Sequence, residues 1–513
     1  MAENNRVKNS VLACCLILLT VAPVASLHAA AQRINQEGRL LGPAPVVTNS
    51  TLFNTAAADA ITSAMQIFPV TSAWNEDISS RPVLPNSDAM IAQITSDLAT
   101  NRRTLRVFYE MNFVLVPDPQ PPVPISFLLY AGESDPSPYP IPPNMPIEGW
   151  PNSVTNTFSD WQQDAYHIGG DRHAIVVQPG LGALYETWQA KLVGTNWQAS
   201  NGAKFDLNSN NLRHTNWTSG DAAGLPMFAA LPRYDECERG MVEHACRIVV
   251  AQSRQEWIYP ARHYASSTPA SQTNVPAMGQ RVRLKSSFVI PASWAKEEKA
   301  LLLGLKKYGA FVADNGGFFS ISVTPDDRWP GNAFSHISSI GITNFEVIQT
   351  TGEFEGPRSP GAPIASAGLA QSVPVGVAAN LAGYVTYTGS PPVIQWKAYS
   401  GPGTVTFGNA AQTNTTATFS GPGTYTLVLS ANDSVHAVAY DAVVITVASF
   451  IALTITRSGT NAVFNWLGAS PPYVLESSPA LPASSWTTIL TTNVQTVSLP
   501  MQGSNLFFRV RGK

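Results

Sequence analysis

The sequence has little charge, few cysteines and no long apolar run beyond its first residues. Only 13% of the 513 residues are Asp, Glu, Lys or Arg, whereas the usual share is about a quarter. The 31 Lys and Arg do not exceed the 34 Asp and Glu and form no basic run, so nucleic-acid binding is not expected. After the N-terminus no segment approaches the roughly 20 apolar residues of a membrane-spanning helix. We therefore predict no membrane span.

Short motifs with a known chemistry are also missing. The sequence contains no HExxH zinc motif, no GxSxG nucleophile elbow, no P-loop and no dinucleotide-binding glycine pattern. No cofactor and no metal is therefore predicted. A metal site formed by His173, Glu186 and His263 stays open as an alternative, because imidazole and carboxylate groups are common metal ligands.

The N-terminus has the pattern of a secretory signal. Arg6 and Lys8 precede an apolar run at residues 11–24, and three small residues follow at 29–31. This order predicts cleavage near Gln32. The mature protein is then expected to be secreted, periplasmic or held at the cell surface.

Cleavage would remove Cys14 and Cys15 and leave Cys237 and Cys246 as the thiols of the mature chain. An even pair in an oxidising compartment is usually a disulfide. The short loop between the two residues contains Gly240, as a hairpin does. We predict a disulfide that stabilises the fold by about 2–3 kcal/mol. The alternative is two reduced cysteines, one of them in the core.

Changes in composition divide the chain into five parts. The segment EGPRSPGAPIASAG, which begins at Glu355, is rich in Pro, Gly, Ala and Ser and is typical of a linker. The predicted parts are a signal peptide at 1–31, a large domain at 32–355, a linker at 356–372, a β-sandwich at 373–448 and a small β module at 449–513. The mature protein is therefore expected to have one large domain and two accessory modules.

The first accessory module shows the alternation of a sandwich strand. Tyr425, Leu427 and Leu429 point to one face of the predicted strand, and Thr424 and Thr426 point to the other. The phrases WKAYSGPGTVTFGNA, TTATFSGPGTYTLVLSANDS and AVVITV resemble Ig-like or PKD-like modules of large secreted bacterial proteins. The tail with TRSGTNAVFNW, YVLESSPAL and LFFRVR looks like a C-terminal module of exported proteins of the Verrucomicrobia. Both resemblances imply spacing, surface attachment or weak glycan contact.

The large domain is expected to be mainly β, with a jelly-roll or sandwich-like arrangement and about two helices. One helix is predicted after a cap at Ser87 or Asp88, with an apolar face formed by Met90, Ile91, Ile94 and Leu98. The second is predicted from Ser293 to Tyr308, with Leu301, Leu302 and Leu305 buried and Gly309 at its end. The phrases FPVTSAWNEDIS, GDRHAIVV, NWTSGDAAGLP, PARHYAS and VADNGG resemble an uncharacterised family of exported bacterial proteins. That resemblance supports a single domain.

A hairpin near the centre of this domain is the first candidate site. Residues 172–178 and 183–188 read as two strands around the turn Pro179–Gly182. If Gln178 pairs with Ala183, His173 and Glu186 become diagonal neighbours on one face of the sheet. An imidazole beside a carboxylate is the minimal acid/base pair. Asp171 extends the same face, and Trp188 offers a stacking surface for a sugar ring. The alternative is a structural hydrogen-bonded pair in a half-buried sheet.

Further candidates come from later segments. Asp221 lies in a turn-prone segment, where it is either a catalytic acid or a turn cap. His263 is a candidate second imidazole, and Trp217, Arg262 and Tyr264 are candidate substrate-binding residues. Asp314 and Asn315 line the same pocket or form a plain turn. Other ionisable residues gather near the expected disulfide hairpin, where paired carboxylates suit glycoside hydrolysis or form a solvated tip: Arg213, Arg233, Asp235, Glu236, Glu243 and His244.

Together these patterns predict a secreted carbohydrate-active protein, a polysaccharide hydrolase or lyase whose partner is a polysaccharide or a cell-envelope glycan. The support is export, the His173 and Glu186 face, and the accessory modules. The alternative is a surface or adhesion protein that binds glycan or envelope material without catalysis.

Overall fold

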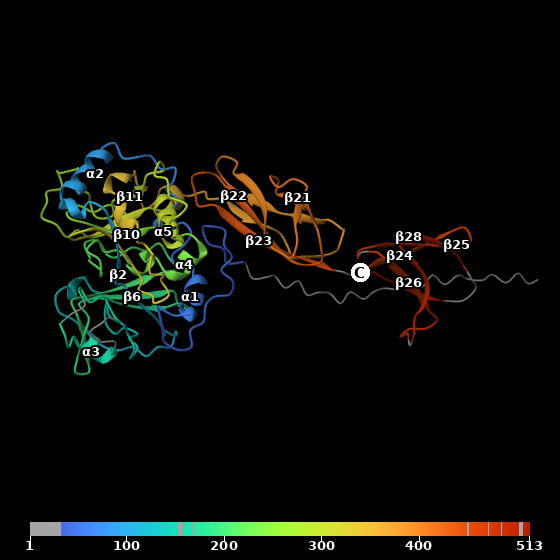
Figure 1. The fold of residues 1–513 in the computed structure, drawn as a ribbon, viewed down its shortest axis with the longest axis horizontal. Helices are drawn as coiled ribbons and strands as arrows, with labels where there is room; N and C mark the ends of the chain where they lie inside the picture. Colours follow the sequence, from blue (N-terminus) through green and yellow to red (C-terminus); the bar gives the residue numbers. More distant parts are fainter. Residues whose placement is uncertain are drawn as a thin grey trace, which may run out of the picture.

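The structure is a computed structural model. It describes residues 32–513 except 152–156, 168–169, 449–450, 470, 484, 502–505 and 513. The predicted signal peptide lies outside the described residues. Strands dominate the large domain and both C-terminal modules, so the mainly-β prediction is confirmed. Figure 1 shows the large domain, the first module and the C-terminal module in a row.

The large domain has two main sheets around one continuous hydrophobic core. The five-stranded sheet runs in the order β1 (Thr51–Leu52), β3 (Val114–Leu115), β5 (Ala174–Gln178), β6 (Ala183–Trp188) and β9 (Asn201–Asp206). The six-stranded sheet runs in the order β14 (Phe345–Val347), β11 (Arg281–Leu284), β12 (Ala310–Asn315), β10 (Cys246–Val250), β13 (Phe319–Val323) and β2 (Leu105–Tyr109). A three-stranded sheet joins β4 (Ile125–Phe127), β8 (Asn196–Ala199) and β7 (Lys191–Val193).

The six-stranded sheet is mixed. Its pairs β10–β12 and β13–β2 are parallel, and its other pairs are antiparallel. A jelly roll is antiparallel throughout. The strand arrangement of the six-stranded sheet is therefore not that of a jelly roll.

Both predicted helices are present, and three short ones were not foreseen. The helix α2 (Ser87–Ser96) buries Met90, Ile91 and Ile94, as expected, but its cap residue is Asn86 rather than Ser87 or Asp88. The helix α5 (Lys296–Lys307) buries the three predicted leucines and is followed by Gly309, whose φ of +65° needs a glycine. The additional helices are α1 (Ala56–Ser63), α3 (Phe158–Gln163) and α4 (Tyr234–Arg239).

The predicted disulfide between Cys237 and Cys246 is wrong. Both residues are free cysteines and both are fully buried. The reason is local: the segment expected to form a hairpin contains α4, with Cys237 on its inner face, while Cys246 begins the central strand β10. The alternative of two reduced cysteines describes the structure, but both of them, not one, lie in the core.

We expect these two thiols to be inert in the folded protein. Burial raises the pKa of Cys237 and of Cys246 above the ordinary value of a thiol, so little thiolate is present to react. A thiol reagent should label neither cysteine of the processed chain under native conditions and both after unfolding. A reductant should leave the melting temperature unchanged, whereas a drop on reduction would show that a bridge forms.

The first accessory module is a β-sandwich with its own core around Trp396, Tyr425, Leu427 and Leu429. Its four-stranded sheet runs β16 (Gln371–Pro374), β23 (Ala439–Ala448), β22 (Gly423–Asn432) and β19 (Val393–Ser400). A three-stranded sheet joins β17 (Ala379–Ala382), β21 (Asn414–Phe419) and β20 (Val405–Phe407), and a further pair joins β15 (Ile364–Ser366) to β18 (Tyr384–Thr386). The burial of alternate residues in β22 is as predicted.

The segment expected to be a loose linker is ordered in two places. A 3₁₀ turn at Gly356–Arg358 holds Arg358 against Glu76 of the large domain, with a closest N–O distance of 3.2 Å. Strand β15 already belongs to the first module, which therefore begins nine residues before Val373. Composition located this domain boundary but did not predict that the segment is ordered, because a Pro- and Gly-rich segment can still be fixed by a buried ion pair.

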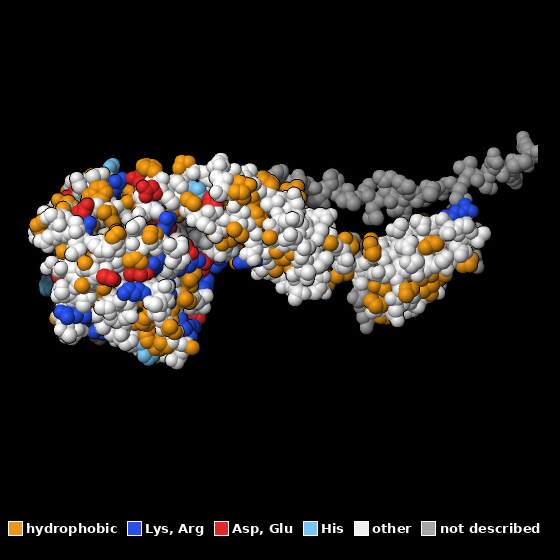
Figure 2. Space-filling view, turned by 90° about the horizontal axis from the view of Figure 1, so that it is seen from above, with side chains coloured by type: hydrophobic (Ala, Val, Ile, Leu, Met, Phe, Trp, Pro, Cys, Tyr) orange, Lys and Arg blue, Asp and Glu red, His pale blue; other side chains and the backbone are white. Residues whose placement is uncertain are grey.

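The C-terminal module has two three-stranded sheets around Phe464, Trp466, Tyr473 and Leu475. One sheet runs β24 (Ala452–Ser458), β25 (Asn461–Leu467) and β28 (Thr496–Pro500), and the other runs β27 (Thr487–Thr492), β26 (Tyr473–Ser478) and β29 (Phe507–Arg511). Figure 2 shows that charged side chains gather on the large domain and are sparse on the visible faces of both modules.

The first described residues lie against the first module. Gly38 packs on the ring of Tyr440, and the backbone N–H of Leu40 donates a hydrogen bond of 3.1 Å to the hydroxyl of Tyr399. The side chain of Arg39 turns the other way and pairs with Glu243 of the large domain at 2.9 Å. The N-terminal segment is therefore held between the large domain and the first module.

Candidate functional site

Ionisable side chains from both main sheets meet between the sheets. Arg247 and Asp314 come from the six-stranded sheet, Glu110 follows its edge strand β2, and His173 immediately precedes β5 of the other sheet. Glu148 and Asp221 reach the same region from loops. We call this set the carboxylate cluster: Glu110, Glu148, His173, Asp221, Arg247 and Asp314.

Strand register explains why part of the cluster shares one face. On β10, Val249 pairs with Ser320 of β13, which places Arg247 opposite Ser322. A register shift after Ile248 places Asp314 of β12 opposite Val249. Because alternate residues of a strand share a face, the side chains of Arg247, Ser322 and Asp314 all project toward the five-stranded sheet.

Arg247 is the centre of the cluster. Its Nε donates to Asp221 Oδ2 at 2.9 Å, its Nη2 contacts Asp221 Oδ1, and its Nη1 donates to Ser322 Oγ at 3.0 Å. The Ser322 hydroxyl in turn donates to Glu110 Oε1 at 2.6 Å. Asp314 Oδ2 lies 3.8 Å from Arg247 Nη2. One buried guanidinium therefore faces two aspartates directly and a glutamate through a hydroxyl.

His173 is held between two acceptors. Its Nδ1 lies 2.9 Å from Glu148 Oε2 and its Nε2 lies 3.0 Å from the carbonyl oxygen of Gly220. Both ring nitrogens must carry a proton to satisfy both acceptors. Burial opposes the charge, but the negative charge of Glu148 and its hydrogen bond outweigh it and raise the pKa of His173 to about 9. His173 is thus an imidazolium with no free lone pair, and it cannot act as the general base that the sequence led us to expect.

We expect the stabilising effect of His173 to depend on pH. Because the pKa is raised from 6.5 to about 9 on folding, this contribution is complete below the unfolded value and is lost as the pH rises through about 9. The shift corresponds to about 3 kcal/mol. Urea unfolding of wild type and His173→Gln, compared near neutrality and above about pH 9, should show the difference in free energy shrinking. A constant difference would contradict the imidazolium assignment.

Glu186 has a separate role. The predicted register of the hairpin is confirmed, with Gln178 opposite Ala183 and Ile175 opposite Glu186. However, Glu186 is fully buried and accepts the backbone N–H groups of Met227 at 2.9 Å and Phe228 at 2.8 Å. Burial raises its pKa to about 7 despite these hydrogen bonds. The expected accessible pair of His173 and Glu186 is therefore wrong, since each side chain is buried and bound to other partners.

Two carboxyl groups of the cluster have raised pKa values and reach solvent. Burial, with the nearby charge of Asp221, raises the pKa of Asp314 to about 6 although Arg247 opposes the shift. Burial also raises the pKa of Glu110, although Ser322 donates a hydrogen bond to it. The Asp314 side chain is 27% exposed. Glu148 is the contrast: burial disfavours its charge, but His173 outweighs burial and lowers its pKa. Carboxyl groups with opposite shifts in one site are the usual arrangement for acid/base chemistry.

The backbone brings His263 to the edge of the cluster. The N–H of Ala223 bonds to the carbonyl of Ala313, and the N–H of His263 bonds to the carbonyl of Ala223. Nδ1 of His263 lies 2.7 Å from the carbonyl oxygen of Ala222, and its Nε2 lies 4.0 Å from Glu133 Oε2. His263 is partly exposed, so its outer nitrogen faces both solvent and Glu133.

The predicted substrate-binding residues lie around this edge. Trp188 is half-buried with its ring centre 6.0 Å from that of Tyr130, and Tyr264 stacks on His263 at 6.0 Å. Trp217 lies against the guanidinium of Arg213 at 5.6 Å. Arg262 lies over Trp257 at 5.6 Å and pairs with Glu353 at 3.7 Å. Asp171 is exposed and outside the cluster.

The ionisable residues near α4 form a different network. Glu236 is buried between Arg233, at 3.1 Å, and His244, at 3.2 Å, while Asp235 pairs with Arg239 at 2.5 Å. Glu243 binds Arg39. These contacts join α4 to the N-terminal segment, so the residues are neither a solvated tip nor part of the carboxylate cluster.

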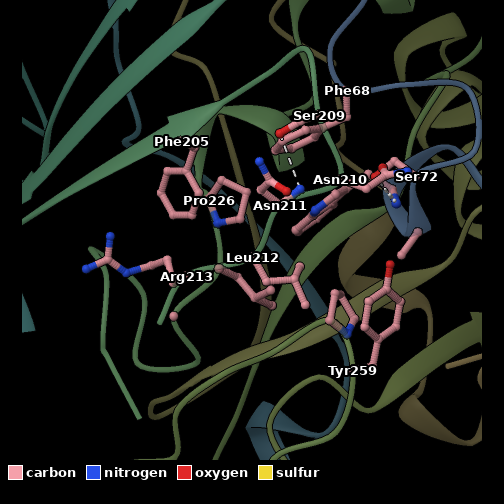
Figure 3. A pocket seen from close by; sticks show the side chains of 15 residues that line it. Phe68, Ser72, Phe205, Ser209, Asn210, Asn211, Leu212, Arg213, Pro226 and Tyr259 are labelled. Carbon is pink, nitrogen blue, oxygen red and sulfur yellow. Dashed lines mark hydrogen bonds between the residues drawn. The ribbon is translucent and has the colours of Figure 1, made fainter. Parts of the chain in front are cut away.

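A hollow is lined in part by residues that follow Asp221 in the chain (Figure 3). Its lining includes Asn210, Asn211, Pro226 and Tyr259, and also Gly224 and Leu225. The segment after Asp221 therefore lines this hollow, whereas Asp221 itself binds Arg247 in the carboxylate cluster.

Two features are absent from the described residues: a cluster of metal ligands and a membrane-spanning helix. In the part of the chain that the structure describes, no group of three or more His, Cys, Asp or Glu side chains is arranged to hold a metal ion. The alternative of His173, Glu186 and His263 as metal ligands is thus not found. In the same residues, no helix combines the length and apolarity needed to cross a membrane.

Comparisons with known proteins give no family. No family model matches the sequence, and no curated protein matches it. Among solved structures, a crystal structure of titin domains is similar over 33% of this chain and 73% of that chain, with 12% identity and a TM-score of 0.14. At that TM-score the likeness carries no weight for fold or function.

Sequence reasoning missed three members of the cluster, Glu110, Glu148 and Arg247. Only Arg247 leaves a visible signal, because a charged residue between Cys246 and Ile248 interrupts an apolar strand. Glu110 follows an ordinary strand, and Glu148 lies in a Pro-rich loop without a pattern. Of the residues that the sequence singled out, the structure brings His173, Asp221 and Asp314 into the cluster and His263 to its edge.

Proposed function

We propose that the large domain is an acid/base enzyme that cleaves a polysaccharide outside the cell, as a hydrolase or lyase. One observation carries the proposal: Asp314 is a partly exposed carboxyl group with a pKa near 6, set against the buried Asp221 and Arg247 pair. A group that titrates near neutrality and is fixed beside a charged pair suits proton transfer.

In this proposal Asp314 exchanges the proton. In a hydrolase, protonated Asp314 donates to the leaving glycosidic oxygen, and a second carboxylate activates water or attacks the sugar carbon. Glu110 is the candidate for the second role, because it also belongs to the half-buried part of the cluster. Arg247 fixes Asp221 and limits how far the pKa of Asp314 rises. Glu148 holds one ring nitrogen of His173, and the other ring nitrogen donates to the carbonyl oxygen of Gly220. This contact fixes the Asp221 loop.

The edge of the cluster offers surfaces for a sugar. The exposed ring of Tyr264 is an aromatic face beside His263, and Trp188 forms a second one with Tyr130. Aromatic side chains with one apolar face and one solvated edge suit contact with sugar rings. The predicted export signal and the two accessory modules support an extracellular polysaccharide as the partner.

An activity screen of the full processed chain tests the proposal. The protein is incubated with neutral, acidic and amino polysaccharides, and both reducing ends and unsaturated products are measured. New reducing ends alone indicate hydrolysis, whereas unsaturated products indicate a lyase. Binding without either product would replace the proposal with the alternative of a glycan-binding surface protein, which the burial of His173 and Glu186 favours.

A further inference from the structure

A second, small hollow lies beside Glu76 at the edge of the six-stranded sheet. Its wall includes Glu76, Tyr259, Arg281, Gln349, Thr350 and Thr351. It shares Ala73, Tyr259 and Pro260 with the hollow in Figure 3. We call it the arginine hollow, because three arginines surround the carboxylate in its wall.

Positive charge is in excess at this place. Glu76 pairs with Arg81 at 2.7 Å, with Arg358 at 3.2 Å and with Arg281 at 3.9 Å. The neighbouring acids are engaged elsewhere: Glu346 pairs with Arg283 and Glu353 with Arg262. One carboxylate therefore faces three guanidinium groups, so this group of four side chains carries a net formal charge of +2.

Much of this excess charge is buried. The side chains of Arg281 and Arg358 are 2% and 4% exposed. Burial, together with the repulsion of Arg358 and Arg81, lowers the pKa of Arg281 to about 10 although Glu76 opposes the shift. Arg281 and Arg358 both donate hydrogen bonds to backbone carbonyls, but repulsion between buried charges of one sign is costly. An anion at this place would remove the imbalance.

Arg281 has one nitrogen left for a ligand. Its Nε and Nη2 donate to the carbonyl of Tyr308 at 2.8 and 2.6 Å. The guanidinium lies over the ring of Phe311, and its Nη1 is 3.9 Å from Glu76, beyond hydrogen-bond distance, and donates no hydrogen bond among the residues that the structure describes. Hydroxyl and amide donors of Thr350 and Gln349 line the same hollow. Charged and neutral donors thus converge on one small space.

We propose that the arginine hollow binds a compact oxyanion, the sulfate, phosphate or carboxylate group of an anionic ligand. A planar guanidinium with neighbouring hydroxyl donors matches the oxygens of such a group. The hollow shares Ala73, Tyr259 and Pro260 with the one in Figure 3, so a ligand bound here would lie beside that second hollow. The site is independent of whether the carboxylate cluster is catalytic, because its test is binding and not turnover.

Calorimetry with the full processed chain tests the site with three probes: inorganic sulfate, a sulfated oligosaccharide and its neutral counterpart. Saturable binding of sulfate that chloride at equal ionic strength does not reproduce supports the site. Tighter binding of the sulfated oligosaccharide than of free sulfate shows that the natural oxyanion is carried by a saccharide. Absence of binding by both sulfate and the sulfated sugar overturns the proposal.

Two substitutions locate the binding. Gln349→Glu adds a negative charge at the exposed mouth of the hollow and should weaken sulfate binding about fivefold or more. The matched change Gln272→Glu, on a remote exposed loop, should leave it unchanged. Equal weakening by both variants would mean a general charge effect and would overturn the site.

Glu76→Gln distinguishes a ligand site from a purely structural ion network. If the hollow is an oxyanion site, removing the carboxylate should tighten sulfate binding several-fold, because three arginines then face the ligand alone. If sulfate binds Glu76→Gln but not the wild type, Glu76 alone satisfies the arginines and the proposal is wrong.

Discussion

Replacing Asp314 with asparagine should reduce turnover by about 10²–10⁴-fold, because general acid/base catalysis by a positioned side chain typically contributes that much. The substitution keeps the size of the side chain and removes only its ability to exchange a proton. The measurement is kcat on the polysaccharide identified by the screen, with circular dichroism to confirm the fold. The matched change Asp88→Asn, at an exposed position of α2, should leave kcat within a factor of about two, since surface substitutions rarely matter.

The pH dependence of kcat shows whether Asp314 donates or accepts the proton. If Asp314 donates the proton, the protonated form is active, so kcat should fall as the pH rises through about 6. If Asp314 instead accepts a proton, kcat should fall as the pH decreases through the same value. Full turnover of Asp314→Asn, or a profile without a transition near this pH, would remove Asp314 from the mechanism.

Replacing Arg247 with methionine should destabilise the protein by about 3–5 kcal/mol. Asp221 is 0% exposed and is bound by Arg247 through both of its oxygens. Methionine replaces the apolar part of the arginine side chain but carries no charge. The buried carboxylate of Asp221 would lose its cation, and the Ser322 hydroxyl, which donates to Glu110, would lose the hydrogen bond from Arg247. The measurement is the free energy of unfolding in urea.

A double variant and a surface control separate charge from packing. Arg247→Met combined with Asp221→Asn should recover a large part of the loss, because the uncompensated buried charge is gone. Lys296→Met breaks the exposed pair with Glu238 and should cost less than about 1 kcal/mol. If Arg247→Met costs no more than this control, the cluster is not organised around the arginine.

The elements that the sequence predicted well depend on local patterns. Strand β22 follows from its alternation, α5 from the spacing of its leucines and the glycine after it, and the hairpin of β5 and β6 from its turn. The predicted disulfide failed because two cysteines on a short loop give the same spacing whether the loop is a hairpin or begins with a helical turn. With 6 residues, α4 is too short for its sequence to show a helical period.

The candidate site was less predictable because its members are distant in the sequence. Glu110 and Arg247 meet through Ser322, and no pattern within one segment contains that contact. The predicted register of the hairpin is confirmed, but the predicted exposure of His173 and Glu186 is wrong. The loops that carry Gly220 and Met227 cover the face that holds these two side chains. Sequence periodicity tells which face a side chain takes but not what later segment will lie over it.

The contacts of Gly38 and Leu40 with Tyr440 and Tyr399 join positions that are far apart along the chain. Tyr399 lies 359 residues after Leu40 in the chain, so this contact forms only after the first module has been synthesised. The large domain can complete its own core before then, and Arg39 can already pair with Glu243. Ending the protein at residue 355 would remove Tyr399, Tyr440 and Arg358, so the N-terminal segment would lose its contacts with the first module and Glu76 would lose one of its three arginines.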